Sequence, residues 1–282
     1  MIGAIAGDIV GSRFEFDNIK SKEFDFFTKD CRFTDDSVMT CAVAESLMRS
    51  WRKDKFATLD DVAKDTLRDV GYWYPRCGYG RRFVEWMYGD DPKPYNSCGN
   101  GSAMRISPVG DIARSVEEAR ELSCAVTAIT HNHVEGIKGA EATAIANYLA
   151  RTGKNKGEIR TFIEAEYYDL STTVDDYREA LEGHGKEICQ LSVPQALRCF
   201  YEGENYEDVI RNCISIGGDS DTIAAIAGGI AEAYFGVPYD IEEQALTYLD
   251  CTLFGIADKF ERFKQGHVFH EGFHFLSKTK ER

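Results

Sequence analysis

Two acidic clusters lie far apart in the sequence, and each precedes a segment with helical periodicity. The first is Thr34-Asp35-Asp36, ahead of the apolar pattern of residues 38–51. The second is Asp219-Ser220-Asp221-Thr222, which follows Gly217-Gly218 and opens the pattern that ends at Phe235. Taken alone, each cluster fits a helix N-cap, because hydroxyl and carboxylate oxygens accept hydrogen bonds from the free N–H groups of a first helical turn.

If both clusters face one cavity, four carboxylates repel one another unless protons or cations are present. Oxygen ligands without nearby His or Cys favour hard cations, Mg²⁺ foremost, with Mn²⁺ or Ca²⁺ as alternatives. Asp219 and Asp221 do not share a helix face, yet they can converge if Asp219 is the non-helical cap residue. The residues therefore predict a divalent-cation site between two helix starts, and the charge balance of four carboxylates suggests two ions.

The elements that position these clusters are helices. Apolar residues recur at steps of three and four in segments 38–51, 59–72, 116–129, 137–149, 159–168, 193–201, 206–216, 219–235 and 242–263. No comparable segment alternates strictly. The sequence predicts an all-α fold, and without a long linker it predicts a single compact domain over residues 1–276, followed by a frayed polar tail at 277–282.

The bulk composition limits the class of partner and compartment. The chain has 282 residues and a formal net charge of −14, which argues against nucleic-acid or anionic-membrane binding through a basic surface. Its nine cysteines are dispersed and contain no C-x-x-C pair, which is typical of a reducing cytosol. The apolar N-terminus lacks a basic n-region and is interrupted by Asp8, and no segment is long enough to span a bilayer. We expect a cytoplasmic protein.

Several motifs give the sequence a family resemblance. In the order seen in ADP-ribosylglycohydrolases, it contains Gly7-Asp8-Ile9-Val10-Gly11-Ser12, Thr34-Asp35-Asp36-Ser37, the segment Gly99-Asn100-Gly101-Ser102-Ala103-Met104-Arg105, Thr130-His131 and Gly217-Gly218-Asp219-Ser220-Asp221-Thr222. The chain resembles that family, which includes the dinitrogenase reductase-activating glycohydrolases, from its first residues to about Phe235. The resemblance implies a compact all-α enzyme that hydrolyses the glycosidic bond between ADP-ribose and an acceptor, with ADP-ribosylated proteins or small-molecule conjugates as substrates.

The resemblance also implies ligands for two Mg²⁺ ions, with Mn²⁺ as a substitute. The first ion would be bound by Thr34, Asp35, Asp36 and Asp221. The second would be bound by Asp219, Asp221 and Thr222, so that Asp221 bridges the two. Glu15 matches a glutamate that in some members closes over the site and reaches a metal.

A glycine-rich segment would, by the same resemblance, line the diphosphate and the proximal ribose. Its candidate contacts are Ser97, Gly99, Asn100, Gly101, Ser102 and Met104. Glycines allow several backbone N–H groups to approach phosphate oxygens without side-chain obstruction. The alternative is that Asn100-Gly101 is only a turn.

Two further residues are candidate substrate contacts. His131 could hydrogen-bond substrate hydroxyls or phosphate, and the alternative is a structural histidine. Tyr79, in the aromatic segment 72–80, could stack on adenine or shape the leaving-group side, and the alternative is a cluster that caps the core.

Two other patterns are interpreted as structural. His267, His270 and His274 suggest a metal triad, but Gly272 interrupts their helical register. Gly3, Gly7 and Gly11 have the small-residue spacing of a closely packed helix, although a nearby ligand would also fit.

Hydrolysis of a glycosidic bond passes through an oxocarbenium-like state, so a carboxylate near the anomeric carbon can activate water. We expect Asp36 or Asp35 in that role, with Asp219 as the next candidate and Glu15 as a further catalytic residue. Two other functions stay open: a non-catalytic ADP-ribose-binding protein, and a two-metal phosphohydrolase. The acceptor is not readable from the sequence, and arginine, serine, a nucleobase or an ester all fit.

Overall fold

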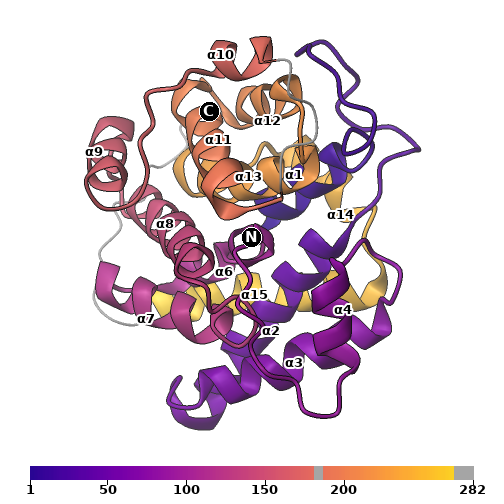
Figure 1. Cartoon of the computed structure of the whole chain (residues 1–282), viewed down its shortest axis with the longest axis vertical. Coiled ribbons are helices and arrows are strands. Elements are labelled where there is room, and N and C mark those ends of the chain that lie inside the picture. The colour runs from indigo at the N-terminus through magenta and orange to yellow at the C-terminus, as the bar shows by residue number, and fades with distance from the viewer. Residues whose placement is uncertain (181–186, 270–282) are drawn as a thin grey trace, which may run out of the picture.

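The first helix, α1 (Ile2–Gly11), lies at the centre of the molecule, and every one of its residues is buried. It packs most extensively against α13 (Ser220–Phe235), and Figure 1 shows the indigo α1 beside the orange α13. A helix that is apolar all round must be covered on all sides. Helix α1, which precedes the first acidic cluster, and helix α13, which begins at the second, therefore pack together in the core.

Glycines allow the close approach of α1 to α13. A Cβ atom added at Gly3 would lie 2.5 Å from the carbonyl oxygen of Gly228, and one added at Gly11 would lie 2.7 Å from the backbone nitrogen of Asp221. Real Cβ contacts are not this short, so neither position has room for a side chain. The structure confirms that the small-residue spacing in α1 serves helix packing, and it places the end of α1 against the start of α13.

A computed structural model describes residues 1–180 and 187–269, with side chains described as far as His267. The described residues form helices without a named strand, apart from an isolated bridge between Gly99 and Ile188, so the all-α prediction is confirmed. The remaining helices are α2 (Asp35–Asp54), α3 (Leu59–Trp73), α4 (Arg81–Tyr88), α5 (Gly101–Met104), α6 (Ser107–Ile112), α7 (Val116–Thr127), α8 (Val134–Arg151), α9 (Lys156–Glu166), α10 (Val174–Glu179), α11 (Cys189–Glu202), α12 (Tyr206–Ile216), α14 (Tyr239–Leu246) and α15 (Cys251–Phe269).

Both acidic clusters are helix starts, as the sequence predicts. Thr34 is the N-cap of α2 and its side chain accepts a hydrogen bond from the N–H of Asp36. Asp219 is the N-cap of α13 and has non-helical backbone angles, φ −78° and ψ 74°. Gly217 and Gly218, with φ of 71° and 81°, form the turn before it. This left-handed turn requires glycine, and it aims the chain from α12 into α13.

The single helix predicted over residues 242–263 is wrong. The chain forms α14 and α15 instead, separated by residues 247–250. Asp250 starts the second helix, because its carboxylate accepts hydrogen bonds from the N–H groups of Thr252 and Leu253, both at 2.9 Å. Apolar spacing continues across the break, so periodicity alone does not reveal it.

The C-terminal expectations are only partly covered by the structure. His267 lies in α15, with its ring 4.4 Å from that of Trp51 and 5.2 Å from that of Phe263, between centroids. His270, His274 and the tail at 277–282 lie outside the described residues. Among the described helices, none has the length and hydropathy needed to cross a membrane.

Candidate active site

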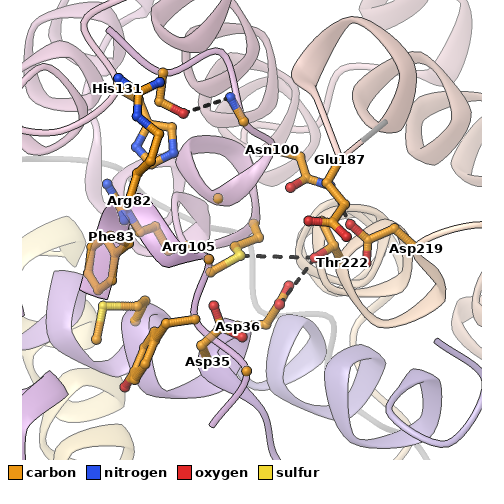
Figure 2. Close-up of a pocket in the computed structure, with 18 of the residues that line it drawn as sticks. Asp35, Asp36, Arg82, Phe83, Asn100, Arg105, His131, Glu187, Asp219 and Thr222 are labelled. Atoms are coloured by element: carbon orange, nitrogen blue, oxygen red, sulfur yellow. Dashed lines mark hydrogen bonds between the residues drawn. The ribbon is translucent and has the colours of Figure 1, made fainter. Parts of the chain in front are cut away.

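The starts of α2 and α13 open into one pocket of about 430 Å³. Figure 2 shows Asp35 and Asp36 entering from one side and Asp219 and Thr222 from another. The pocket is lined by most of the residues predicted from the sequence, namely Glu15, Asp35, Asp36, Tyr79, Ser97, Gly99, Asn100, Gly101, Met104, His131, Asp219, Asp221 and Thr222. Segments almost 190 positions apart in the chain thus share one cavity, because α1 packs against both helices.

A direct hydrogen bond joins the two acidic clusters. The Thr222 hydroxyl donates to Asp36 Oδ2 at 3.1 Å, and the bond is buried. The other oxygen of this carboxylate, Oδ1, is buried and has no hydrogen-bond partner among the described residues. A buried carboxylate oxygen without a donor is costly, so this oxygen is free for a ligand that the protein itself does not supply.

The carboxylates form two triads that share Asp221. Asp8, Asp36 and Asp221 each present an oxygen within 4.8 Å of the others, and so do Glu15, Asp219 and Asp221. Asp219 and Asp221 converge because Asp219 is the non-helical cap, as the sequence predicts. A donor set of carboxylate oxygens with no His or Cys fits hard divalent cations such as Mg²⁺ or Mn²⁺.

Crowding and burial shift the ionisation of these groups. Burial, and then the charge of Asp8, raise the pKa of both Asp35 and Asp36 well above the ordinary value. Burial, and then Asp219, do the same to the pKa of Asp221. Burial together with Asp219 and Glu187 raises the pKa of Glu15 to about 7. Four crowded carboxylates with raised pKa values need protons or cations to relieve their mutual repulsion.

Asp8 is a member of the first triad that the site prediction did not include. Its carboxylate accepts hydrogen bonds from the N–H of Thr34 at 2.9 Å and of Ser37 at 3.1 Å, and from both hydroxyls of these residues. It is fully buried in α1 and therefore fixes the first turn of α2 from a neighbouring helix. The available signal was an acidic residue inside an otherwise apolar helix.

Asn18 is a second residue that the sequence prediction missed. Its side chain donates to the carbonyl of Gly218 at 2.9 Å and accepts from the N–H of Gly218 at 2.7 Å. It also donates to the carbonyl of Glu15 at 3.2 Å. Asn18 thereby ties the segment that carries Glu15 to the glycine turn that precedes Asp219, and nothing in local sequence pattern indicates this long-range contact.

Asn100 lines the pocket, and it also orients one of the predicted metal ligands. Its side-chain amide donates to Asp219 Oδ2 at 2.6 Å and to Ser192 Oγ at 2.9 Å. The turn alternative for Asn100 is therefore incomplete, because the side chain reaches across the pocket to α13.

Two of the predicted site residues do not line the pocket. Thr34 is 4% exposed and its hydroxyl donates to Asp8 Oδ1 at 2.6 Å. Ser102 is fully buried, and its hydroxyl lies 2.8 Å from the carbonyl oxygen of Gly136. Ser102 supports the wall behind the glycine segment, so this arrangement offers no direct contact between its side chain and a ligand in the pocket.

The glycine-rich segment offers fewer free N–H groups than its composition suggests. The N–H groups of Gly99, Asn100, Ala103 and Met104 already donate to oxygens within the protein, at 2.8 to 3.1 Å. The N–H of Gly101 has no acceptor in the part of the chain that the structure describes. The expectation of several free backbone donors is therefore reduced to Gly101, because most of the segment satisfies its own turn.

Cationic and aromatic side chains also line the pocket. Arg81, Arg82 and Arg105 line it, as do Tyr79 and Phe83, whose rings lie 5.4 Å apart between centroids. The buried Tyr79 hydroxyl has no hydrogen-bond partner among the described residues. Figure 2 places Arg82, Phe83 and His131 away from the carboxylates. The pocket thus contains guanidinium groups as well as carboxylates.

Comparison with known proteins agrees with this architecture. Residues 1–267 match the sequence profile of the family described as ADP-ribosylglycohydrolase. Human ADP-ribosylhydrolase ARH3 is 25% identical in an alignment 313 positions long, which covers 84% of each chain. ADP-ribosylarginine hydrolase Tri1 of Pseudomonas putida is 24% identical, over 84% of this chain and 70% of its own. A solved structure described as an ADP-ribosylglycohydrolase-related protein complex shares the fold, with a TM-score of 0.66, 23% identity, and coverage of 93% and 97% of the two chains.

The fold and the acidic pocket define a helical protein whose candidate site lies between two helix starts. The chain belongs to the ADP-ribosylglycohydrolase family, as the match over residues 1–267 shows. It is an ADP-ribosylglycohydrolase, an enzyme that hydrolyses ADP-ribosyl bonds, in agreement with the names of its relatives.

Proposed function

We propose that this enzyme uses divalent cations, Mg²⁺ foremost, to cleave the glycosidic bond between ADP-ribose and an acceptor, releasing free ADP-ribose. The observation that carries the proposal is the buried Asp36 Oδ1, which has no donor among the described residues and belongs to the carboxylate triad of Asp8, Asp36 and Asp221. A cation satisfies this oxygen and compensates the surrounding charge at once.

We assign the site to two ions. The first would be held by Thr34, Asp35, Asp36 and Asp221, and the second by Asp219, Asp221 and Thr222, with Glu15 as an additional ligand. The two triads around Asp221 support the roles of Asp36, Asp219, Asp221 and Glu15, since each triad brings its oxygens within 4.8 Å of one another. Thr34, Asp35 and Thr222 are assigned from the family resemblance. When bound, such ions supply Lewis acidity and a template for oxygen atoms of substrate and water.

The reaction needs a group that removes a proton from water. A bond forms between the water oxygen and the anomeric carbon as the bond to the acceptor breaks. The water proton passes to a carboxylate, which then gives it up through solvent to the leaving acceptor, so the carboxylate is regenerated. We assign the proton-accepting role to Asp35, which lines the pocket, whereas Asp36 is held by Thr222 and Asp219 by Asn100. Asp36, Asp219 and Glu15 are the other candidates.

The remaining pocket residues would bind the ADP-ribose. Its volume of about 430 Å³ falls in the range of small-molecule sites. Candidate contacts are Ser97, Gly99, Asn100, Gly101, Met104, His131 and Tyr79. The free N–H of Gly101 suits a phosphate oxygen, and the unpartnered Tyr79 hydroxyl suits a polar substrate atom.

We propose ADP-ribosylated arginine as the first acceptor to test, because one relative is named an ADP-ribosylarginine hydrolase. We further propose that the enzyme works in the cytoplasm on protein or small-molecule conjugates, which fits nine cysteines that are all free.

The test is a panel of defined conjugates of ADP-ribose with arginine, serine, a nucleobase and a small ester, incubated with Mg²⁺ or with EDTA. We expect free ADP-ribose from at least one conjugate, in the presence of Mg²⁺ only, and no release by an Asp35→Ala variant. Release of AMP or inorganic phosphate would instead establish a phosphohydrolase. Binding of ADP-ribose without release from any conjugate would establish a binding protein.

A further inference from the structure

Away from the carboxylates, three buried residues form a hydrogen-bonded chain in the pocket wall. Arg105 is 1% exposed, Thr130 0% and His131 5%. Arg105 Nη2 donates to Thr130 Oγ1 at 2.8 Å, and the same Oγ1 lies 2.8 Å from His131 Nδ1. Arg105 and His131 both line the pocket. The chain therefore runs from a buried positive charge to a ring that faces the ligand space.

The chemistry of these groups fixes the direction of each hydrogen bond. A guanidinium has donors only, so Thr130 Oγ1 accepts from Arg105. The Thr130 hydroxyl proton can then go to His131 Nδ1 at 2.8 Å or to the carbonyl oxygen of Thr127 at 3.3 Å. That carbonyl already accepts the backbone N–H groups of Thr130, at 3.1 Å, and His131, at 2.9 Å. The shorter and less crowded bond is the one to Nδ1.

A neutral imidazole has one protonated nitrogen. Burial lowers the pKa of His131 well below its ordinary value, with the charges of Arg105 and Arg82 acting in the same direction, so the ring is neutral at physiological pH. If Nδ1 accepts the Thr130 proton, the ring proton lies on Nε2.

The Nε2 atom lies beside the glycine segment of the pocket. A Cβ atom added at Gly99 would be 3.4 Å from Nε2, and one added at Gly101 would be 3.5 Å from it. Both glycines line the pocket, so the absence of side chains at these positions leaves Nε2 accessible. Figure 2 shows the His131 ring on the side of the pocket remote from Asp35 and Asp36.

We propose that Arg105 and Thr130 hold His131 in the Nε2–H tautomer, so that the ring presents a fixed hydrogen-bond donor to an oxygen atom of the bound substrate. Arg105 and Thr130 are positioning residues, because they act through the ring. The ring binds and does not transfer a proton, since a neutral imidazole with a buried positive neighbour gives up no proton at neutral pH. The substrate contact rests on the proposed function, whereas the tautomer does not.

The first experiment measures the tautomer without any ligand. A long-range ¹H–¹⁵N correlation spectrum of the full chain, labelled with ¹⁵N-histidine, separates protonated from unprotonated ring nitrogens. The chain has six histidines, and a His131→Gln variant identifies the signals of this ring by their loss. We expect a protonated Nε2 and an unprotonated Nδ1. A protonated Nδ1, or averaged signals from both tautomers, would overturn the proposal.

A matched pair of variants tests the role of Thr130. Thr130→Val keeps the branched shape and removes the hydroxyl, and we expect mixed tautomers, about tenfold weaker ADP-ribose binding and a higher KM with a smaller change in kcat. Thr130→Ser keeps the hydroxyl, and we expect it to restore all three. Persistence of the Nε2–H tautomer in a folded Thr130→Val protein contradicts the role of Thr130. If Thr130→Val does not fold, the wild-type spectrum still decides the tautomer, and a protonated Nδ1 there overturns the proposal.

The outcome is independent of the hydrolase assignment. If the protein has the Nε2–H tautomer but cleaves no conjugate, the tautomer proposal holds and the proposed function is wrong. If the protein cleaves a conjugate but has a protonated Nδ1, the proposed function holds and the tautomer proposal is wrong.

Discussion

At the scale of single residues, Asp36 holds the two halves of the site together. One of its oxygens accepts a hydrogen bond from Thr222, and the other is buried without a donor among the described residues. Two carboxylates of the same triad lie close by, so the cation-free site stores unfavourable repulsion. A ligand that binds here stabilises the native protein by mass action.

We predict that Asp36→Asn separates these effects. The amide removes one of the crowded charges, so the thermal stability of the cation-free variant should equal or exceed that of the wild type. The gain in stability on adding Mg²⁺, about 2.7 kcal/mol at a hundredfold excess over Kd for one ion, should largely disappear. Thermal unfolding with Mg²⁺ and with EDTA measures both, and calorimetric titration measures cation affinity. A variant that keeps the full Mg²⁺ response would remove Asp36 from the ligand set.

Asn18 is a residue whose contacts near the site cannot be predicted from local sequence. Its side chain satisfies both polar backbone groups of Gly218, 200 positions away. The motifs around Asp35 and Asp219 are recognisable because each is compact in sequence, whereas this contact exists only after α1 and α13 have packed. Asp8 is an intermediate example. The sequence shows an acidic residue within an apolar helical segment, but it does not show which residues that carboxylate contacts.

We predict that Asn18→Ala loosens the turn before Asp219. Two half-buried backbone groups of Gly218 lose their partners, which costs about 1 kcal/mol, and kcat should fall more than stability alone explains because Asp219 and Glu15 lose their fixed separation. Urea unfolding and kinetics below the unfolding transition separate the two effects. The exposed Asp17→Ala serves as a neighbouring control and should leave kcat unchanged. Unaltered kinetics for Asn18→Ala would limit Asn18 to a structural contribution.

At the scale of elements, the site depends on how closely α1 approaches α13. The helical segments and the caps of α2 and α13 follow from periodicity and from residues with strong terminal preferences, so the sequence predicts them well. The break between α14 and α15 was missed because an Asp cap interrupts a pattern that remains apolar on both sides. The glycines of α1 predict that this helix packs closely against another helix, but they do not identify α13 as the partner.

We predict opposite results for two glycine substitutions. Gly11→Ala would place a methyl group 2.7 Å from the backbone nitrogen of Asp221, so the start of α13 must move; stability should fall by about 1–3 kcal/mol and activity should be lost more than proportionally. Gly255→Ala, inside α15, meets no atom within 4 Å and should stabilise the protein by about 0.5–1 kcal/mol without changing kcat. Urea unfolding and steady-state kinetics measure both. Equal effects of the two substitutions would contradict the tight contact between α1 and α13.

At the scale of the whole molecule, charge is distributed in two unequal clusters. Among the described residues, the pocket carboxylates form no ion pair with Lys or Arg, whereas a second buried cluster pairs its charges internally. The amino group of Met1 lies 2.6 Å from Asp111 and 2.7 Å from Glu232, and Lys264 lies 2.6 Å from Glu261. The third group of acidic residues that could hold a cation, Asp111, Glu232 and Glu261, is therefore occupied by ammonium groups. The same residue types thus serve stability in one place and ligand binding in the other.

The internally paired cluster predicts a defined pH dependence of stability. Burial opposes ionisation of Asp111, but the Met1 amino group and Lys264 hold its pKa below the ordinary value of 3.8, so its contribution is present above about pH 4 and is lost as the pH falls. Burial opposes the charge of the Met1 amino group, but Asp111 and Glu232 raise its pKa above the ordinary 8.0. The stabilisation from this amino group is therefore present below about pH 8 and is lost as the pH rises. The stabilisation should be greatest between these limits.

We predict that Asp111→Asn lowers the free energy of unfolding by about 3 kcal/mol near pH 6, because it leaves buried ammonium groups with one fewer carboxylate. The difference between wild type and variant should stay constant from about pH 5 to pH 8, shrink on the acid side as Asp111 is protonated, and shrink again when the Met1 amino group loses its proton. Urea unfolding across this range measures the curve, with the exposed Asp91→Asn as a control that should show no such plateau. A difference that keeps growing toward low pH would contradict a lowered pKa for Asp111, because protonation of the wild-type carboxyl must bring the two proteins together.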